Sequence, residues 1–290
     1  MEVTCAVLGP RGTFSSEAAH RYWGGNVKLL EVDSIAEVFY MVTHGSVDAG
    51  MVPLENSLSG SIATTMDKLE ENPVFIAGEI LMSINHCLLA AAALSLHEVE
   101  LVISQPQVLV QCEKFLKTFL PEARREIVES TARAASIIRT ETRRAAAIGP
   151  YQAASIYGLK VIRSGIQDNP NNKTRFIHLS RTLSYSEGAD KSSLVFSLQD
   201  RPGALYRAVG AFARRNVNMV KIESRSRQHR SDEYRFFVDI EGTPRNAQVA
   251  EALHELQEVS IGYRFLGSYR SAEKRGEGNA KRQVVAQVGK

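Results

Sequence analysis

The amino-acid sequence predicts an α/β protein made of a two-lobed region and a smaller unit that follows it. Strand-like apolar runs alternate with segments of helical periodicity from Val3 to about Arg163, which is typical of parallel βαβ units. A polar, aperiodic stretch at 184–191, SYSEGADK, is typical of a linker. Beyond it the apolar pattern has the order βαββαβ, a split βαβ unit.

Length and composition narrow the class of protein. The 290 residues are enough for two domains, and 44% hydrophobic and 23% charged residues are ordinary for a globular chain. A formal net charge of +3 is too small to indicate a nucleic-acid partner. Apolar runs stay short of the roughly 20 residues of a membrane span, and the amino terminus lacks signal-peptide features, so a cytoplasmic location is expected. Three scattered cysteines (Cys5, Cys87 and Cys112) favour small buried side chains over a disulfide framework or a zinc site.

The first lobe is predicted to contain three strands and three helices. The strands are expected at 3–8, 27–32 and 47–52, and the helices begin near Ser15, Ser34 and Ser61, with Ser15 and Ser34 as N-caps. Ligands of such sheets bind at the carboxyl ends of the strands. Two polar loops, Gly12-Thr13 and Glu55-Asn56-Ser57, lie at such ends. The first also precedes a helix, where backbone N–H groups can hold an anion.

The second lobe is predicted as an insertion into the first. Its strands are expected within 74–93, interrupted at Glu79 and at Asn85-His86, and then at 100–104, 125–128, 144–148 and 160–163. Its helices are expected at 107–119, from Ser130 or Thr131 to about 139, and from 149 to 157. The chain then returns to the first lobe for a strand at 174–179. Two lobes with two crossovers form a cleft, a common place for a small-molecule site.

The smaller unit is predicted to be ferredoxin-like. Its strands are expected at 193–198, 217–226, 233–240 and 259–266, and its helices at 203–212 and 245–256. Residues 271–290 contain few large apolar side chains, so a flexible tail is expected, disordered over 272–280 and weakly strand-like at 283–288.

The stretch NKTRFIHLS, from Asn172 to Ser180, combines a turn with the start of a strand. Thr174 supplies a hydroxyl and Arg175 a guanidinium, which can hold a carboxylate through two parallel hydrogen bonds. On spacing alone a capped turn with a surface arginine explains the same residues.

Five motifs, in order along the chain, resemble those of the prephenate dehydratase family. They are Gly9-Pro10-Arg11-Gly12-Thr13-Phe14, Val52-Pro53-Leu54-Glu55-Asn56-Ser57, Asn85-His86-Cys87-Leu88-Leu89, Glu129-Ser130-Thr131 and Thr174-Arg175-Phe176. Two later motifs, Asp200-Arg201-Pro202-Gly203-Ala204-Leu205 and Glu223-Ser224-Arg225, resemble the ligand site of an ACT regulatory domain.

The resemblance implies a periplasmic-binding-protein-like catalytic domain at 1–181, a linker at 182–191, an ACT domain at 192–270 and a tail at 271–290. It implies a lyase that converts prephenate to phenylpyruvate in phenylalanine biosynthesis, with phenylalanine as an inhibitory effector. Because aromatisation drives this reaction, no metal or redox cofactor is required. The open edge of a ferredoxin-like sheet favours a homodimer or homotetramer formed through the ACT domains.

The resemblance also implies roles for the site residues. Thr174 matches the family's catalytic residue, and we expect its hydroxyl to assist departure of the substrate hydroxyl. Arg175 is expected on the pyruvyl carboxylate, because a cation on the departing carboxylate would stabilise the ground state. Glu55 is a candidate proton donor if burial raises its pKa, and Asn56 a candidate catalytic residue, although each could instead close a turn or cap a helix. The ring carboxylate and the rest of the substrate are assigned to Gly12, Thr13, Ser57, Ser130, Thr131 and Phe176.

No catalytic role is assigned to the histidines or to Gln105. His20, His86 and His178 have no triad or metal-ligand spacing and are interpreted as structural. Gln105 stands where the family commonly has His, so a titrating group is absent at that position.

In the ACT domain we expect Gly203, Ala204 and Leu205, at a helix start, to hold an amino-acid carboxylate. Glu223 or Asp200 could hold the ammonium group, within a motif completed by Ser224 and Arg225. Ser226 replaces the proline that usually follows in the family, a departure that concerns ligand affinity rather than the fold.

Two alternatives remain open at this point. An arogenate dehydratase performs the same chemistry on a substrate with an amino group in place of the keto oxygen. A two-lobed amino-acid sensor would need Arg175 but not Thr174, so the pair favours an enzyme.

Overall fold

The computed structural model describes residues 2–141, 143–227 and 230–272. The chain divides into two compact units. Unit 1 contains Met1–Thr65 and Leu81–Phe176, and unit 2 contains Met66–Ile80 and Ile177–Lys290. The expected flexible tail lies, from residue 273 on, outside the described residues.

The first lobe is built on parallel strands, as the alternating pattern predicts. Strand β1 (Val3–Leu8) pairs in parallel with β2 (Val27–Val32) and with β3 (Ala49–Asn56). Helices α1 (Phe14–Trp23) and α2 (Ile35–Thr43) both contact β1 and β3. The sheet order is β2-β1-β3-β11-β5, in which β5 (Phe75–Ser83) and β11 (Lys173–Ser180) are continuous strands that pass from one unit into the other.

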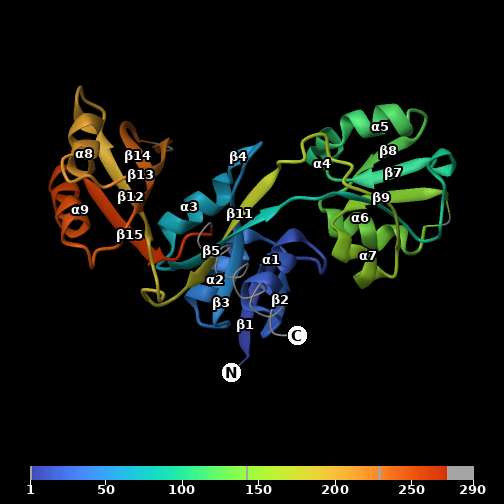
Figure 1. Ribbon diagram of the computed structural model, residues 1–290, viewed down its shortest axis with the longest axis horizontal. Helices are drawn as coiled ribbons and strands as arrows, with labels where there is room; N and C mark the ends of the chain where they lie inside the picture. Colours follow the sequence, from blue (N-terminus) through green and yellow to red (C-terminus); the bar gives the residue numbers. More distant parts are fainter. Residues whose placement is uncertain (1, 142, 228–229, 273–290) are drawn as a thin grey trace, which may run out of the picture. The chain divides into compact units, whose positions relative to one another are not determined.

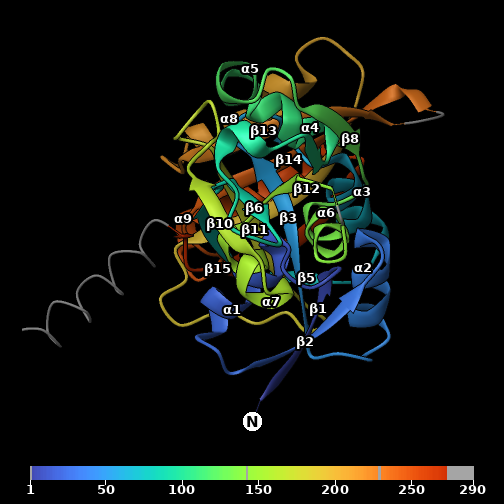
Figure 2. The ribbon, with the colours of Figure 1, turned by 90° about the vertical axis from the view of Figure 1, so that its right-hand side faces the viewer.

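The second lobe has a five-stranded sheet of order β10-β6-β9-β7-β8. Its strands are β6 (Cys87–Ala90), β7 (Leu101–Ser104), β8 (Arg124–Ile127), β9 (Ala145–Gly149) and β10 (Lys160–Ser164). Its helices are α4 (Pro106–Gln111), α5 (Glu113–Phe119), α6 (Thr131–Ile138) and α7 (Tyr151–Tyr157), with a short η1 (Leu96–Glu98). Helices α6 and α7 contact each other, and Figure 2 shows both in front of the sheet.

Helices cover both faces of this sheet, and the sequence of β7 shows why. Leu101 and Ile103 pack with α6 and α7, whereas Val102 between them packs with α4 and α5. Successive side chains of a strand point to opposite faces, so a continuous apolar run fits a sheet buried on both sides.

Three local predictions are corrected by the structure. The single helix expected at 107–119 is two helices that meet at Cys112, whose backbone (φ −115°, ψ 18°) leaves the helical region. The N-cap of α1 is Thr13 rather than Ser15, because the Thr13 side chain accepts from the backbone N–H of Ser16. Glu55 and Asn56, expected in a loop after a strand at 47–52, are instead the end of β3, which pairs with β4 (Gly60–Ser61) in a hairpin.

Unit 2 contains the predicted βαββαβ unit. Its elements are β12 (Lys191–Gln199), α8 (Ala204–Ala213), β13 (Met219–Arg227), β14 (Arg230–Glu241), α9 (Ala247–Val259) and β15 (Gly262–Tyr269), with sheet order β13-β14-β12-β15. Helices α8 and α9 pack together and bury Phe196, Phe236 and their neighbours against one face of the sheet (Figure 1). The ferredoxin-like order is confirmed.

The other face of this sheet holds the carboxyl end of α3 (Ala63–Glu71) and the start of β5. Arg264 of β15 donates to the backbone oxygens of Glu70 (2.8 Å) and Val74 (2.8 Å), which terminates α3. Arg225 of β13 pairs with Asp67 at 2.9 Å. Residues 66–80 therefore belong structurally to the smaller unit, although the domain boundaries predicted above place them in the catalytic domain.

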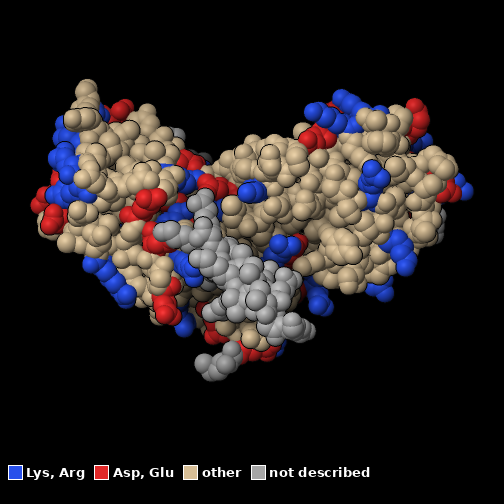
Figure 3. Space-filling model, viewed as in Figure 1, with Lys and Arg blue, Asp and Glu red and all other residues tan. Residues whose placement is uncertain are grey.

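The segment predicted as a linker is bonded into unit 2. Tyr185 forms a bridge with Ser268, and the carboxylate of Asp190 accepts from the backbone N–H of Ser271 at 2.7 Å. Elsewhere on the unit, Arg214 and Arg215, at the carboxyl end of α8, pair with Glu255 of α9, and Figure 3 shows basic and acidic atoms side by side over these helices. Within the described ranges, every helix is too short or too polar to cross a membrane.

Candidate functional site

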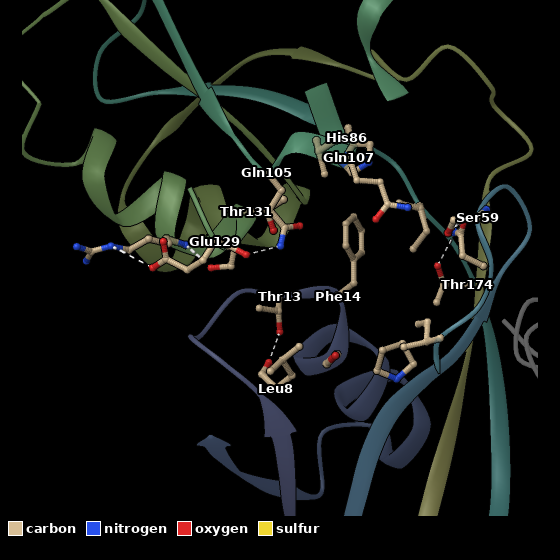
Figure 4. A pocket seen from close by; sticks show the side chains of 18 of the residues that line it. Leu8, Thr13, Phe14, Ser59, His86, Gln105, Gln107, Glu129, Thr131 and Thr174 are labelled. Carbon is tan, nitrogen blue, oxygen red and sulfur yellow. Dashed lines mark hydrogen bonds and ion pairs between the residues drawn. The ribbon is translucent and has the colours of Figure 1, made fainter. Parts of the chain in front are cut away.

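A pocket of about 860 Å³ opens in unit 1 and is lined by both lobes. Its walls come from the end of β1 and the start of α1, from β3 and β11, from the β5–β6 crossover, and from the starts of α4 and α6. Figure 4 labels ten of the lining residues: Leu8, Thr13, Phe14, Ser59, His86, Gln105, Gln107, Glu129, Thr131 and Thr174. The carboxyl ends of strands thus meet at the pocket, as the parallel topology predicts.

Thr174 lies in the pocket wall, 7% exposed, and is held by Asn56. The side-chain Nδ2 of Asn56 donates to Thr174 Oγ1 at 2.9 Å. The Thr174 oxygen therefore acts as an acceptor toward Asn56, and its own proton remains for another partner. A hydroxyl that already accepts a hydrogen bond is polarised and becomes a better donor.

Arg175 and Glu55 form a second cross-strand pair beside Asn56 and Thr174. Arg175 Nη1 lies 3.1 Å from Glu55 Oε1, and the Arg175 side chain is 6% exposed. Neither residue lines the pocket. The physical reason is strand alternation: if Asn56 and Thr174 face the pocket, their strand neighbours face away from it.

Two helix N-termini open onto the pocket. Thr13 caps α1, with its Oγ1 3.3 Å from the Ser16 N–H, and donates to the Leu8 carbonyl at 2.8 Å. Ser130 caps α6, accepting from the Arg133 N–H at 3.0 Å. Both caps line the same cavity, so the positive ends of two helix dipoles favour negatively charged groups in it.

The structure brings six of the ten predicted catalytic and substrate-binding residues into the pocket wall: Thr13, Asn56, Ser130, Thr131, Thr174 and Phe176. The other four, Gly12, Glu55, Ser57 and Arg175, lie outside it. Ser57 is bonded to Lys173, accepting from its N–H at 2.9 Å. Gly12 has φ +86° and packs against α7, where a Cβ would lie 3.5 Å from Ala153 Cα. The roles assigned to all ten stay predictions.

The lining residues that were not predicted as site residues include Phe14, His86, Gln105, Gln107 and Gln111. Gln107 and Gln111 are four residues apart on α4, which begins just after the carboxyl end of β7. That position and the i, i+4 spacing are the signal that would have found them. Gln105 Nε2 donates to the carbonyl of Glu129 at 2.5 Å and so joins the loops that follow β7 and β8.

His86 is buried in the pocket wall, 1% exposed, with Nε2 3.0 Å from Gln111 Oε1. Burial lowers the pKa of His86 below its usual value of 6.5, partly opposed by the bond to Gln111. Its ring meets that of Phe14 edge-on, with centroids 5.6 Å apart. At neutral pH the imidazole is uncharged and contributes shape and hydrogen bonding to the wall.

The described residues contain no group of three or more His, Cys, Asp or Glu side chains arranged to hold a metal ion. Burial raises the pKa of Cys5 and Cys112 to about 12, which disfavours the thiolate that binds metals. We therefore expect turnover to survive exhaustive EDTA treatment, measured beside an untreated sample. Loss of turnover that only a divalent metal restores would contradict this expectation.

The predicted effector residues lie in unit 2, at the start of α8, on β13 and, for Asp200, directly after β12. Gly203, in the left-handed conformation (φ 77°), is the N-cap of α8, directly before Ala204 and Leu205. Glu223, Ser224 and Arg225 lie on the edge strand β13, where Lys221 pairs with Glu223 at 3.3 Å. The side chain of Ser226 lies outside the described part of the chain.

Comparison with known proteins gives two family matches. The prephenate dehydratase family matches residues 5–183, and the ACT domain family matches residues 192–258.

Individual proteins are similar over most of the chain. A bifunctional chorismate mutase/prephenate dehydratase of Aquifex aeolicus is 38% identical over 271 residues, covering 93% of this chain and 74% of the relative. An arogenate dehydratase/prephenate dehydratase of Arabidopsis thaliana is 37% identical over 279 residues, covering 92% and 72%. The crystal structure of a prephenate dehydratase from Arthrobacter aurescens, in complex with L-Phe, has a TM-score of 0.86 and 32% identity, covering 99% of this chain and 100% of that one.

Proposed function

The chain belongs to the prephenate dehydratase family of carbon–oxygen lyases and carries an ACT domain, and from this premise we propose how its pocket performs the reaction. The reaction removes carbon dioxide and a hydroxyl group from a cyclohexadiene and leaves an aromatic ring. The substrate carries two carboxylates. A site for it must hold both carboxylates and assist the departing hydroxyl.

The observation that carries the proposal is the pair of helix N-termini beside the Asn56–Thr174 hydrogen bond. The caps of α1 and α6 supply N–H groups and positive dipole ends to one cavity. We assign one substrate carboxylate to each. This arrangement binds a dianion without a buried cation against the departing carboxylate, which preserves the driving force for loss of carbon dioxide.

Thr174 is proposed as the donor to the departing hydroxyl oxygen. Asn56 donates to Thr174 Oγ1, which leaves the Thr174 proton for the substrate. We propose that the Arg175–Glu55 pair joins β11 to β3 and so fixes the spacing of Thr174 and Asn56. Direct contact of Arg175 with the pyruvyl carboxylate stays a prediction, and it requires the guanidinium to move away from Glu55.

The assay that tests the reaction is formation of phenylpyruvate from prephenate by the purified full-length chain. Arogenate is run in parallel, because one relative of similar identity is named arogenate dehydratase/prephenate dehydratase. Turnover of arogenate alone would change the substrate assignment. Turnover of neither would reject the proposed function.

We further propose that L-phenylalanine binds the ACT domain and inhibits the enzyme. The support is the solved relative in complex with L-Phe, together with Gly203 at a helix start and Glu223 on a neighbouring strand. Strand β13 is a sheet edge, with Val220 and Ile222 exposed on it. Pairing of two such edges would give a homodimer, or a homotetramer, with effector sites at the junction.

We expect phenylalanine to inhibit the full-length chain by weakening its affinity for the substrate. Allosteric coupling usually changes an affinity by roughly 5- to 150-fold. Gly203→Leu should abolish the response and retain basal turnover, because a side chain there fills the space before α8. Gly188→Leu is the matched control, since Gly188 also has positive φ (69°) but lies in the linker, with no atom near its Cβ position.

The full-length chain is required for this test. Arg264 caps α3 from within unit 2, and Met66, Leu69 and Ile76 are each 1% exposed there. A chain cut near residue 181 would lose the partners of this segment. An unchanged response in Gly203→Leu would mean that the effector site lies elsewhere.

The cytoplasmic location stays a prediction, which fractionation of expressing cells would test.

A further inference from the structure

Asn172 carries a side-chain nitrogen without a hydrogen-bond partner among the described residues. The residue is fully buried at 0% exposure, lines the pocket, and directly precedes β11. Its Nδ2 is shielded from solvent and unpaired. A buried donor without an acceptor has lost its hydrogen bonds to water and gained none in exchange, so such groups are rare without a role.

The orientation of this amide is fixed by the backbone. Asn56 Oδ1 accepts from the N–H groups of Leu58 (3.0 Å) and Ser59 (3.1 Å), and a backbone N–H can only donate. The other end of the Asn56 amide is therefore its NH₂ group, which lies 2.7 Å from Asn172 Oδ1. Asn172 in turn must present oxygen to Asn56, which leaves its own NH₂ group as the unpaired end.

Asn172 and Thr174 share one anchor. The Nδ2 atom of Asn56 that binds Asn172 also binds Thr174 Oγ1 at 2.9 Å. Both residues line the pocket, and both accept from Asn56, so their own donor protons are not used in these two hydrogen bonds. The structure thus holds two donors, an amide and a hydroxyl, around one asparagine.

We propose that Asn172 Nδ2 donates a hydrogen bond to the departing hydroxyl oxygen, as a second donor beside Thr174. This role rests on the proposed function. As the C–O bond lengthens, its electron pair moves to oxygen, and a preorganised N–H stabilises that charge. The amide gives up no proton, so the proton that converts hydroxide to water comes by way of Thr174 or from solvent.

The test begins with Asn172→Asp, which keeps the oxygen that accepts from Asn56 and replaces only the NH₂ group. We expect kcat with prephenate to fall roughly 10- to 1,000-fold, as for loss of one donor to a developing oxyanion. Because an introduced carboxylate also repels an anionic ligand, KM and inhibition by phenylpyruvate, which has no departing hydroxyl, are compared in Asn172→Ala, where both should change little. The matched control is Asn171→Asp, the same charge change on the exposed neighbouring residue, which should keep wild-type kcat. Asn172→Ala removes the donor without adding charge and should lower kcat as well.

A double-mutant cycle separates direct donation from positioning. If Asn172 acts only by orienting Asn56 and Thr174, its loss in a Thr174→Ala background costs nothing further. Direct donation predicts a further fall of at least tenfold in that background, measured in single turnovers at high enzyme concentration. A double variant equal to Thr174→Ala alone would overturn the proposal. Failure of the wild-type chain to convert prephenate would instead reject the proposed function itself.

Discussion

Thr174→Ala is expected to lower kcat by roughly two to four orders of magnitude while KM changes little. The hydroxyl is held by Asn56 at 2.9 Å and lies in the wall of the 860 Å³ pocket. A group that donates to an oxygen gaining negative charge acts mainly in the transition state, so its loss appears in kcat. The measurement is steady-state formation of phenylpyruvate, with thermal unfolding to confirm the fold.

Thr174→Ser is the matched control for this change. Serine keeps the hydroxyl and the bond from Asn56 and loses only a methyl group, so we expect kcat within about tenfold of wild type. Near-normal turnover in Thr174→Ala would exclude Thr174 as the donor. An equal loss in both variants would point to packing of the methyl group rather than to the hydroxyl.

Gly267→Ala is expected to destabilise the protein by about 4 kcal/mol or more, among the largest effects of a single substitution. Gly267 in β15 has φ +139°, a conformation that side chains rarely adopt. A Cβ there would lie 2.3 Å from the carbonyl oxygen of Ile76 in β5, so the two backbones must separate. Both residues belong to unit 2, and Ile76 is 1% exposed.

Thermal unfolding measures this effect, and we expect the midpoint to fall by roughly 10 °C. Gly188→Ala is the control: its φ of +69° carries a backbone cost of about 1–2 kcal/mol, but no atom lies within 4 Å of the Cβ position. Equal shifts in the two variants would mean that the contact between Gly267 and Ile76 is not tight in solution.

The fold was largely determined by patterns that the sequence displays. Apolar runs such as Val3–Leu8 and helical spacing after Ser34 specify parallel βαβ units, and the later βαββαβ order specifies a four-stranded sheet with two helices. These patterns are local, so each could be evaluated without the rest of the chain. The motifs around Asn56, Ser130 and Thr174 likewise pointed to residues that meet in one pocket.

Other features depended on contacts between distant segments. The side chains of adjacent residues in a strand point to opposite faces of the sheet. Thr174 therefore faces the pocket, whereas Arg175 faces Glu55, 120 positions away in sequence. Gln107 and Gln111 line the same pocket from α4, in the second lobe.

Three features, then, were decided by tertiary structure alone. One is the docking of residues 66–80 on the sheet of unit 2, which Arg264 and Gly267 determine through contacts with backbone. Another is the amide orientation of Asn172, which follows from backbone donors at Leu58 and Ser59 acting through Asn56. The last is the pocket itself. Hydrophobic periodicity determines which face of each element is buried, but hydrogen-bond partners more than 100 residues apart become defined only when the chain has folded.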